Sequence, residues 1–188
     1  MIDKDILATL QQKICSEPGE QSFNAFYKLC FPALNRFTFS FVKNKEISEE
    51  IVSDIMLKIW QRRKELSKIK NLKLYLYVSA RNHAFNHLRL SKSRETEDIE
   101  NVAVWLKADD QFSPEQKLIN DQQLTRIYKA IKQLPPKCQL IYKLVKEDGF
   151  RYQEVADLLK LSPKTIEAQM AIAVKKLYAA LITPKNLY

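Results

Sequence analysis

The chain has 188 residues, enough for one larger domain or two small ones, and its 46% hydrophobic content is ordinary for a globular protein. Thirty-one Lys and Arg against 22 Asp and Glu give a net charge of +9, which favours a polyanionic partner, either nucleic acid or an acidic membrane surface. No segment approaches the roughly 20 apolar residues that span a bilayer, and the acidic, amphipathic N-terminus is unlike a signal peptide, so we expect no membrane insertion.

The charge lies in blocks that suggest domain boundaries. The net charge by segment is −2 for residues 1–57, +10 for 58–94, −6 for 95–121 and +7 for 122–188. Two basic blocks flanking an acidic one predict two polyanion-binding domains, 1–92 and 117–188, joined by an acidic linker, 93–116. Only two glycines and apolar residues at helical spacing predict an all-α fold with two small helical domains.

Two amphipathic helices are predicted in the first domain. One spans residues 48–66, with Ser48 as N-cap and acidic residues in its first turn. Its buried face is predicted to carry Ile51, Ile55, Ile59 and Trp60. The other spans residues 70–89, with apolar residues at four-residue spacing: Leu72, Leu76, Ala80, Ala84 and Leu88.

The adjacent stripe of the second helix interleaves cations with aromatic rings. Its members are Lys73, Tyr77, Arg81, Phe85 and Arg89. Cations follow phosphates and rings stack on unpaired bases, at about 1–3 kcal/mol each, so the stripe suits single-stranded DNA. The alternative is packing on a neighbouring helix. We favour packing for Phe85, whereas Tyr75 and Tyr77 fit either role.

The second domain is predicted to hold four helices. The first carries an apolar stripe and is closed by Pro135-Pro136. That stripe contains Leu124, Ile127, Ile131 and Leu134. The second helix runs to Asp148-Gly149, where glycine is a common C-terminal signal.

The segment YQEVADLLKLSPKTIEAQM, residues 152–170, contains the other two helices and predicts a helix-turn-helix. Ser162 and Pro163 cap and begin the last helix, and Ala156 allows the two helices to cross closely. The last helix is predicted to bury Ile166, Met170, Val174 and Leu177.

A plain helical hairpin has the same outline, but the flanking residues favour DNA recognition. The groups predicted to hold phosphates are Arg151, Tyr152, Lys175 and Lys176. Those predicted to face base edges are Lys164, Thr165, Glu167, Ala168 and Gln169.

The segment LPPKCQLIYKLVKEDGFRYQEVADLLKLSPKTIEAQMAIAVKKL resembles region four of the bacterial sigma factors, which reads the promoter −35 element. SEEIVSDIMLKIW and YLYVSARN resemble sigma region two, which binds core RNA polymerase and opens the −10 element. The apparent lack of regions one and three places the chain with the extracytoplasmic-function (ECF) group. The sequence departs from the family pattern at Lys160, where Gly is usual, and at an arginine-poor recognition helix.

This resemblance implies specific roles. Docking on the clamp helices of the largest polymerase subunit is assigned to Glu50, Ser53, Asp54 and Leu57, with Ser53 where Gln is frequent. Binding and melting of the −10 element is assigned to Lys68, Lys70, Asn71, Lys73, Tyr75, Tyr77, Arg81, Asn82 and Arg89. The loop LSKIKN, residues 66–71, is expected to capture a flipped promoter base. Region four is expected to contact the second-largest subunit, and an anti-sigma factor is an expected partner.

We find no chemistry that indicates an enzyme, a metal or a cofactor. His83 and His87 lie four residues apart, but a zinc-protease glutamate and a third ligand are missing. Cys15, Cys30 and Cys138 are widely spaced, which indicates reduced thiols and a cytoplasmic protein.

Two other functions fit part of the pattern. A free-standing dimeric helix-turn-helix regulator would bind paired half-sites without polymerase. A helical adaptor would use its basic faces on an acidic protein or lipid headgroups. The helix at residues 70–89, with its cations and rings, favours the sigma factor, because a repressor does not hold single strands.

Overall fold

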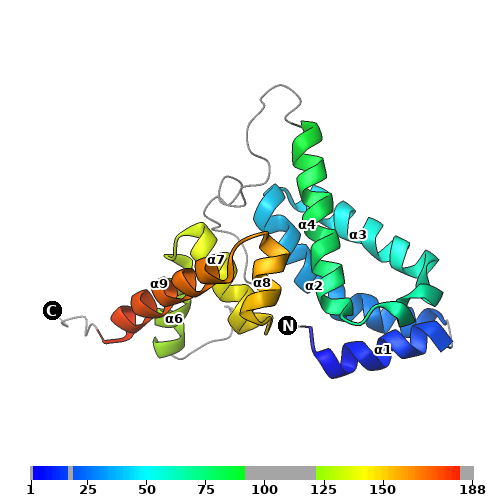
Figure 1. Ribbon diagram of the computed structural model, residues 1–188, viewed down its shortest axis with the longest axis horizontal. Coiled ribbons are helices and arrows are strands. Elements are labelled where there is room, and N and C mark those ends of the chain that lie inside the picture. The colour runs from blue at the N-terminus through cyan, green and yellow to red at the C-terminus, as the bar shows by residue number, and fades with distance from the viewer. Residues whose placement is uncertain (1, 17–18, 92–121, 183–188) are drawn as a thin grey trace. The chain divides into compact units, whose positions relative to one another are not determined.

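The computed structural model describes residues 2–16, 19–91 and 122–182, which fold into helices and the turns between them (Figure 1). The chain divides into two compact units, Met1–Asn101 and Val102–Tyr188. The all-α fold in two helical units is therefore confirmed. The predicted acidic linker, 93–116, lies outside the described residues, so its boundaries stay predictions.

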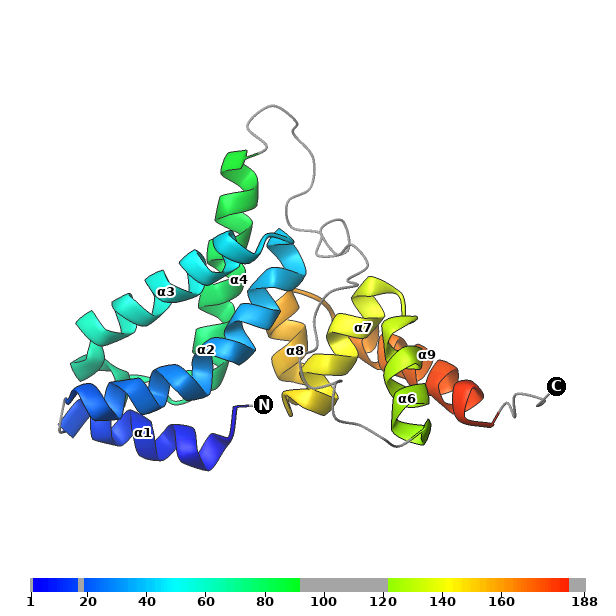
Figure 2. The same cartoon turned by 180° about the vertical axis from the view of Figure 1, so that it is seen from behind.

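The described residues of the first unit form four α-helices and a short 3₁₀-helix. They are α1 (Lys4–Ser16), α2 (Glu20–Val42), α3 (Lys45–Gln61), η1 (Arg63–Lys68) and α4 (Leu72–Ser91). Helix α2 packs against α3 and α4, and α1 lies against α2 and η1 (Figure 2). The core is rich in aromatic residues of α2, with Phe37 contacting Phe41 at 5.1 Å and Tyr77 at 4.9 Å between ring centroids.

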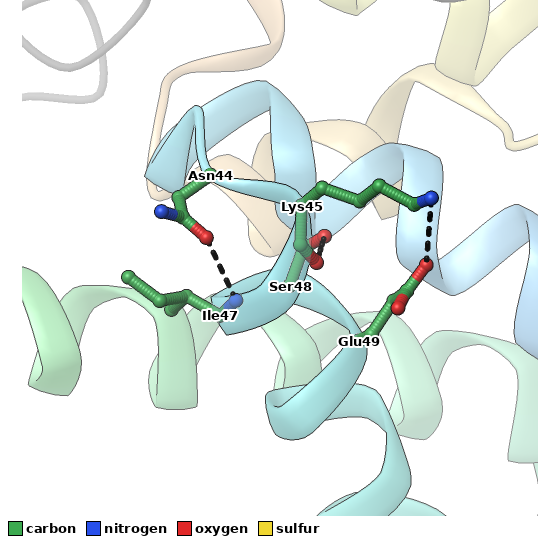
Figure 3. Close-up of polar contacts among 5 residues, drawn as sticks. All are labelled: Asn44, Lys45, Ile47, Ser48 and Glu49. Carbon is green, nitrogen blue, oxygen red and sulfur yellow. Dashed lines mark hydrogen bonds and ion pairs between the residues drawn. The ribbon is translucent and has the colours of Figure 1, made fainter.

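Helix α3 begins three residues before its predicted start. The N-cap is Asn44, whose Oδ1 accepts the Ile47 amide at 2.9 Å, and not Ser48 (Figure 3). Lys43 ends α2 in a left-handed conformation, and Asn44 has the extended conformation typical of an N-cap, so α3 begins directly after it. Ser48 is fully buried in the first turn, where its hydroxyl donates to the Lys45 carbonyl at 2.9 Å. The buried face through Ile51, Ile55 and Ile59 is confirmed.

Helix α4 buries two adjacent stripes instead of one. The predicted apolar stripe is buried at Leu72, Leu76, Ala80 and Ala84. The neighbouring stripe is buried too, because α4 is packed by α2, α3 and α1 together. Asn71 caps α4, its Oδ1 accepting the Leu74 amide at 3.1 Å.

The second unit contains α6 (Gln122–Lys132), α7 (Pro136–Tyr142) with a π-helical turn (Lys143–Glu147), α8 (Tyr152–Leu159) and α9 (Pro163–Ile182). Helix α9 packs on α6, α7 and α8 and so forms the centre of the unit. The predicted stop at Gly149 is confirmed, since this residue has a φ of +70°, which favours glycine.

One residue of the buried stripe of α9 was predicted wrongly. Ile166, Met170 and Leu177 are buried, but Val174 is 54% exposed and Ala173 is fully buried in its place. Ala173 follows Met170 by three residues and Val174 follows it by four, so both positions fit a helical repeat. Ala173 packs against Cys138 of α7 and against Leu134 in the turn between α6 and α7.

Candidate nucleic-acid and polymerase interfaces

One face of α3 is polar, acidic and open to solvent. Glu50, Ser53, Asp54 and Leu57 are all exposed, and their spacing of i, i+3, i+4 and i+7 places them on a single helix face. Leu57 is 54% exposed although it is a large apolar residue. An exposed leucine beside two carboxylates suits a partner that is both apolar and basic at this point.

The stripe of cations and rings on α4 is not a surface. Lys73 is 3%, Tyr77 0% and Arg81 6% exposed, so these three side chains do not form the open helix face that the DNA-binding prediction requires. For Tyr77, this burial corresponds to packing, one of the two roles left open from the sequence. Each side chain is held inside the unit. Lys73 Nζ donates to the Ile2 carbonyl at 3.0 Å, and the Tyr77 ring packs on Phe37. Arg81 donates through Nε and Nη2 to Asn82 Oδ1 at 3.2 and 2.7 Å.

Phe85 is half-buried and packs edge-on against Phe41, with 5.3 Å between ring centroids. Packing was the role favoured for it from the sequence. Five other residues assigned to the −10 element remain accessible, namely Lys68, Lys70, Tyr75, Asn82 and Arg89. Asn71 is half-buried in its capping position.

A cavity of about 620 Å³ lies where α3, η1 and α4 meet. This volume is within the range of about 300–1,000 Å³ that small-ligand sites occupy. Its lining residues are Ile55, Lys58, Ile59, Arg62, Glu65, Leu66, Lys68, Ile69, Tyr75, Ser79 and His83. Tyr75, 41% exposed, offers a ring at its edge, and three cations surround it. The site therefore combines what a nucleotide needs: a stacking surface, an apolar floor and positive charge.

The polar groups of this cavity are held in place by one another. Arg62 donates through Nη2 to Glu65 Oε2 at 2.8 Å, in an exposed pair. His83 Nδ1 lies 2.9 Å from the Ser79 carbonyl oxygen, and His83 Nε2 lies 2.8 Å from Lys58 Nζ.

Sequence analysis missed Lys58, Arg62 and His83 as members of a site. Lys58 and Arg62 are four residues apart in the most basic block of the chain, and that spacing was a usable signal. His83 comes from a different helix, so no local pattern linked it to them.

In the second unit, the predicted cap at the start of α9 is confirmed. Ser162 Oγ accepts the Thr165 amide at 3.1 Å, and its hydroxyl also contacts Thr165 Oγ1 at 2.8 Å. Lys160 adopts the left-handed conformation, with φ 52° and ψ 47°, at the position where the sequence resemblance led us to expect glycine. The turn geometry is thus retained despite the side chain.

The outer face of α9 collects the residues predicted to read bases. Lys164, Glu167, Ala168 and Lys175 are exposed on one face, and Thr165 and Gln169 are half-buried beside it. Arg151, Tyr152 and Lys176 are also exposed. The Arg151 amide donates to Glu154 Oε2 at 2.8 Å, which fixes the start of α8. The unit therefore presents a mixed basic and polar helix face with cations at both ends.

Two cysteines are inert parts of the cores. Burial raises the pKa of the Cys30 thiol from 9.0 to about 12, with Lys73 acting in the opposite direction. Burial likewise raises the pKa of Cys138, opposed by Lys176, and its thiol donates to the Gln169 carbonyl at 3.2 Å. Both thiols are protonated at neutral pH and serve as small apolar residues.

Within residues 2–16, 19–91 and 122–182, no group of three or more His, Cys, Asp or Glu side chains is arranged to hold a metal ion. Among the same residues, none of the helices combines the length and the apolar character that crossing a membrane requires.

These features define a two-unit helical protein with a helix-turn-helix in its second unit. Two family models match it: Sigma-70 region 2 over residues 26–94 and Sigma-70, region 4 over residues 124–177. The chain belongs to the sigma-70 family of RNA polymerase sigma factors and to its ECF group.

Similar proteins agree with this assignment. One curated relative, named "Probable RNA polymerase sigma factor RfaY", from Xanthomonas campestris pv. campestris, is 23% identical over 155 residues. The match covers 82% of this chain but only 39% of the relative's length. The fold is similar to that of the sigma factor RpoE from Bartonella quintana, solved in complex with the anti-sigma factor NepR. That match has a TM-score of 0.57 and 22% identity, and covers 88% of this chain and 99% of the other.

Proposed function

We propose that this protein binds core RNA polymerase and directs it to specific promoters, reading the −10 element with the first unit and the −35 element with the second. The observation that carries the proposal is the cationic cavity beside Tyr75, formed by α3, η1 and α4. A regulator that binds only duplex DNA has no use for such a site, whereas a protein that opens DNA does.

The cavity is proposed to hold a base flipped out of the −10 element. Extruding a base costs a few kcal/mol in lost stacking and pairing, and a pocket that binds the base offsets this cost. Leu66, Lys68 and Ile69 of the loop 66–71 line the cavity, so the loop expected to capture a base forms one of its walls. Tyr75 would stack on the base, and Lys68 would meet the adjacent phosphate.

Polymerase docking is proposed for the outer face of α3, through Glu50, Ser53, Asp54 and Leu57 on the clamp helices of the largest subunit. The exposure of Leu57 supports this assignment. The second unit is proposed to place α9 in the major groove of the −35 element and to contact the second-largest subunit. In that position Lys164, Glu167 and Ala168 face base edges while Lys175 and Lys176 meet phosphates.

The deciding experiment is run-off transcription with purified core polymerase, this protein and a fragmented genomic library from its source. Discrete transcripts that appear only with the protein are expected, together with weak, strongly salt-dependent binding to duplex DNA alone. Tight binding to paired DNA sites without polymerase, and no transcripts, would instead support the free-standing dimeric regulator.

A matched pair of variants tests the cavity within the same assay. Lys68→Glu should abolish strand opening, read as permanganate reactivity of −10 thymines, while closed-complex binding persists. Lys28→Glu is the control, since it makes the same charge change at an exposed position of α2. Equal strand opening in both variants would contradict the assignment.

An anti-sigma factor is proposed as a further partner, covering the polymerase-binding face of α3. The similarity to RpoE, which was solved with such a factor, supports this. Co-purification from native cells, with this chain as bait, should recover a protein that competes with core polymerase. Recovery of polymerase alone would count against it.

A further inference from the structure

A side chain of α1 forms two hydrogen bonds to the loop that lines the cavity, residues 66–71. Gln11 Nε2 donates to the Leu66 carbonyl at 2.6 Å and to the Ile69 carbonyl at 3.0 Å. The Ile69 amide itself donates to the Leu66 carbonyl at 3.0 Å, closing the turn. One amide group therefore spans both ends of the turn that carries Lys68, and it fixes the separation of the two carbonyls.

Helix α1 is anchored firmly enough to act as a support. Leu7 and Ile14 are buried against the rest of the unit. Cys15 Sγ donates to the Arg63 carbonyl at 3.2 Å, at the start of η1. At the other end, the Ile2 carbonyl accepts from the buried Lys73 Nζ at 3.0 Å, which ties the N-terminus to the first turn of α4. Helix α1 thus contacts both ends of η1 and also contacts α4.

This support lies outside the segment that the region 2 family model matches, which begins at residue 26. The loop has no regular helical ladder of its own beyond η1. Contacts from α1 therefore contribute to its shape, and Gln11 bonds directly to two residues that line the cavity, Leu66 and Ile69.

We propose that Gln11 is a positioning residue that sets which base the cavity accepts, by holding the turn Leu66–Ile69 in one conformation. This inference rests on the proposed function of the cavity. A pocket discriminates between bases only if its walls keep their positions, and wall movement lets other bases fit. Loss of the two hydrogen bonds should raise the population of open loop conformations by about tenfold or more.

The test compares Gln11→Met, which keeps the length of the side chain but removes the donor, with Gln12→Met on the exposed side of the same helix. Gln11→Glu is a second variant, because it keeps the shape and replaces the donor with an acceptor. In the free protein, amide hydrogen exchange at Ile69 is expected to be about tenfold faster in both Gln11 variants. Exchange within α4, and all exchange in Gln12→Met, should stay as in the wild type.

With core polymerase, initiation is then measured on promoters that carry each of the four bases at each −10 position. Both Gln11 variants should lower the ratio of best to worst base by about tenfold at one position, with unchanged −35 preference and core affinity. Unchanged amide exchange at Ile69 would refute the idea that Gln11 holds the turn Leu66–Ile69. Faster exchange with unchanged base preference would refute the role of Gln11 in base selection. If the wild-type protein gives no promoter-specific initiation, the proposed function fails, and the role of Gln11 in base selection fails with it. Faster amide exchange at Ile69 in the Gln11 variants would still show that Gln11 holds the turn.

Discussion

Leu57→Ala measures how strongly the outer face of α3 contributes to polymerase binding. Burying a leucine side chain completely is worth about 1.5–3 kcal/mol. Leu57 is 54% exposed in the free protein, so about half of that, roughly 1 kcal/mol, is still to be gained in a complex. Truncation to alanine should forfeit most of this, which corresponds to an increase of about fivefold in Kd.

The assay is a fluorescence anisotropy titration of the labelled protein with core polymerase at fixed salt. Ile6→Ala is the matched control, because Ile6 is 53% exposed on α1, away from the proposed face. Both substitutions are at exposed positions, so the free energy of unfolding should change by less than about 0.5 kcal/mol. An unchanged Kd for Leu57→Ala, or an equal loss in Ile6→Ala, would refute docking through this face.

Three further outcomes follow from the described residues. Because the pKa of Cys30 is raised from 9.0 to about 12, its stabilisation is complete below pH 9 and is lost as pH rises toward 12. Between pH 8 and 10, urea denaturation should therefore show a drop in unfolding free energy about 1.4 kcal/mol larger in the wild type than in Cys30→Ala. Lys160→Gly should stabilise the second unit by about 1 kcal/mol, and Gly149→Ala should destabilise it by a similar amount, since both positions have positive φ. The measurement is the urea midpoint, which should rise for Lys160→Gly and fall for Gly149→Ala. No atom lies within 4 Å of a Cβ placed at Gly149, so the loss there comes from the backbone conformation and not from a clash. In promoter libraries, Glu167→Ala should relax preference at one −35 base pair by about 1–3 kcal/mol. Lys175→Ala should instead weaken all sequences alike and lower the salt slope by about 1.

Helices with one clear apolar stripe could be predicted from sequence. The stripe through Ile51, Ile55 and Ile59 and the helix-turn-helix with its cap at Ser162 were both found this way. In these elements, periodicity and capping depend on residues within a few positions of each other, so the sequence contains the whole signal. The sequence predicted Val174 to be buried, but Ala173 is buried instead. Periodicity does not distinguish these two adjacent positions, because the choice depends on packing against distant residues such as Leu134 and Cys138.

The candidate site of the first unit was harder to predict from the sequence, because it depends on contacts between residues far apart in the chain. Nothing near Lys73 indicates that its side chain will be buried and will donate a hydrogen bond to the carbonyl of Ile2, 71 residues earlier. The cavity likewise joins residues of α3, η1 and α4, and η1 has no periodic pattern of its own. A helix packed on three sides can bury cations and rings as well as leucines, so an alternating stripe alone does not identify a surface.

The burial of Lys73 and Arg81 changes where a single strand would run. With these two inside the unit, most of the exposed cations described in the basic block lie at the end of α3 and along or just after η1, at Lys58, Arg62, Lys64, Lys68 and Lys70, while Arg89 is exposed near the far end of α4. A strand follows exposed cations, so its proposed path lies across the mouth of the cavity and not along the buried stripe of α4 that contains Lys73 and Arg81. The strand would then leave its base at the position that Gln11 controls. Charge removal along η1 should accordingly impair promoter opening, whereas loss of Lys73 should act through folding of the unit.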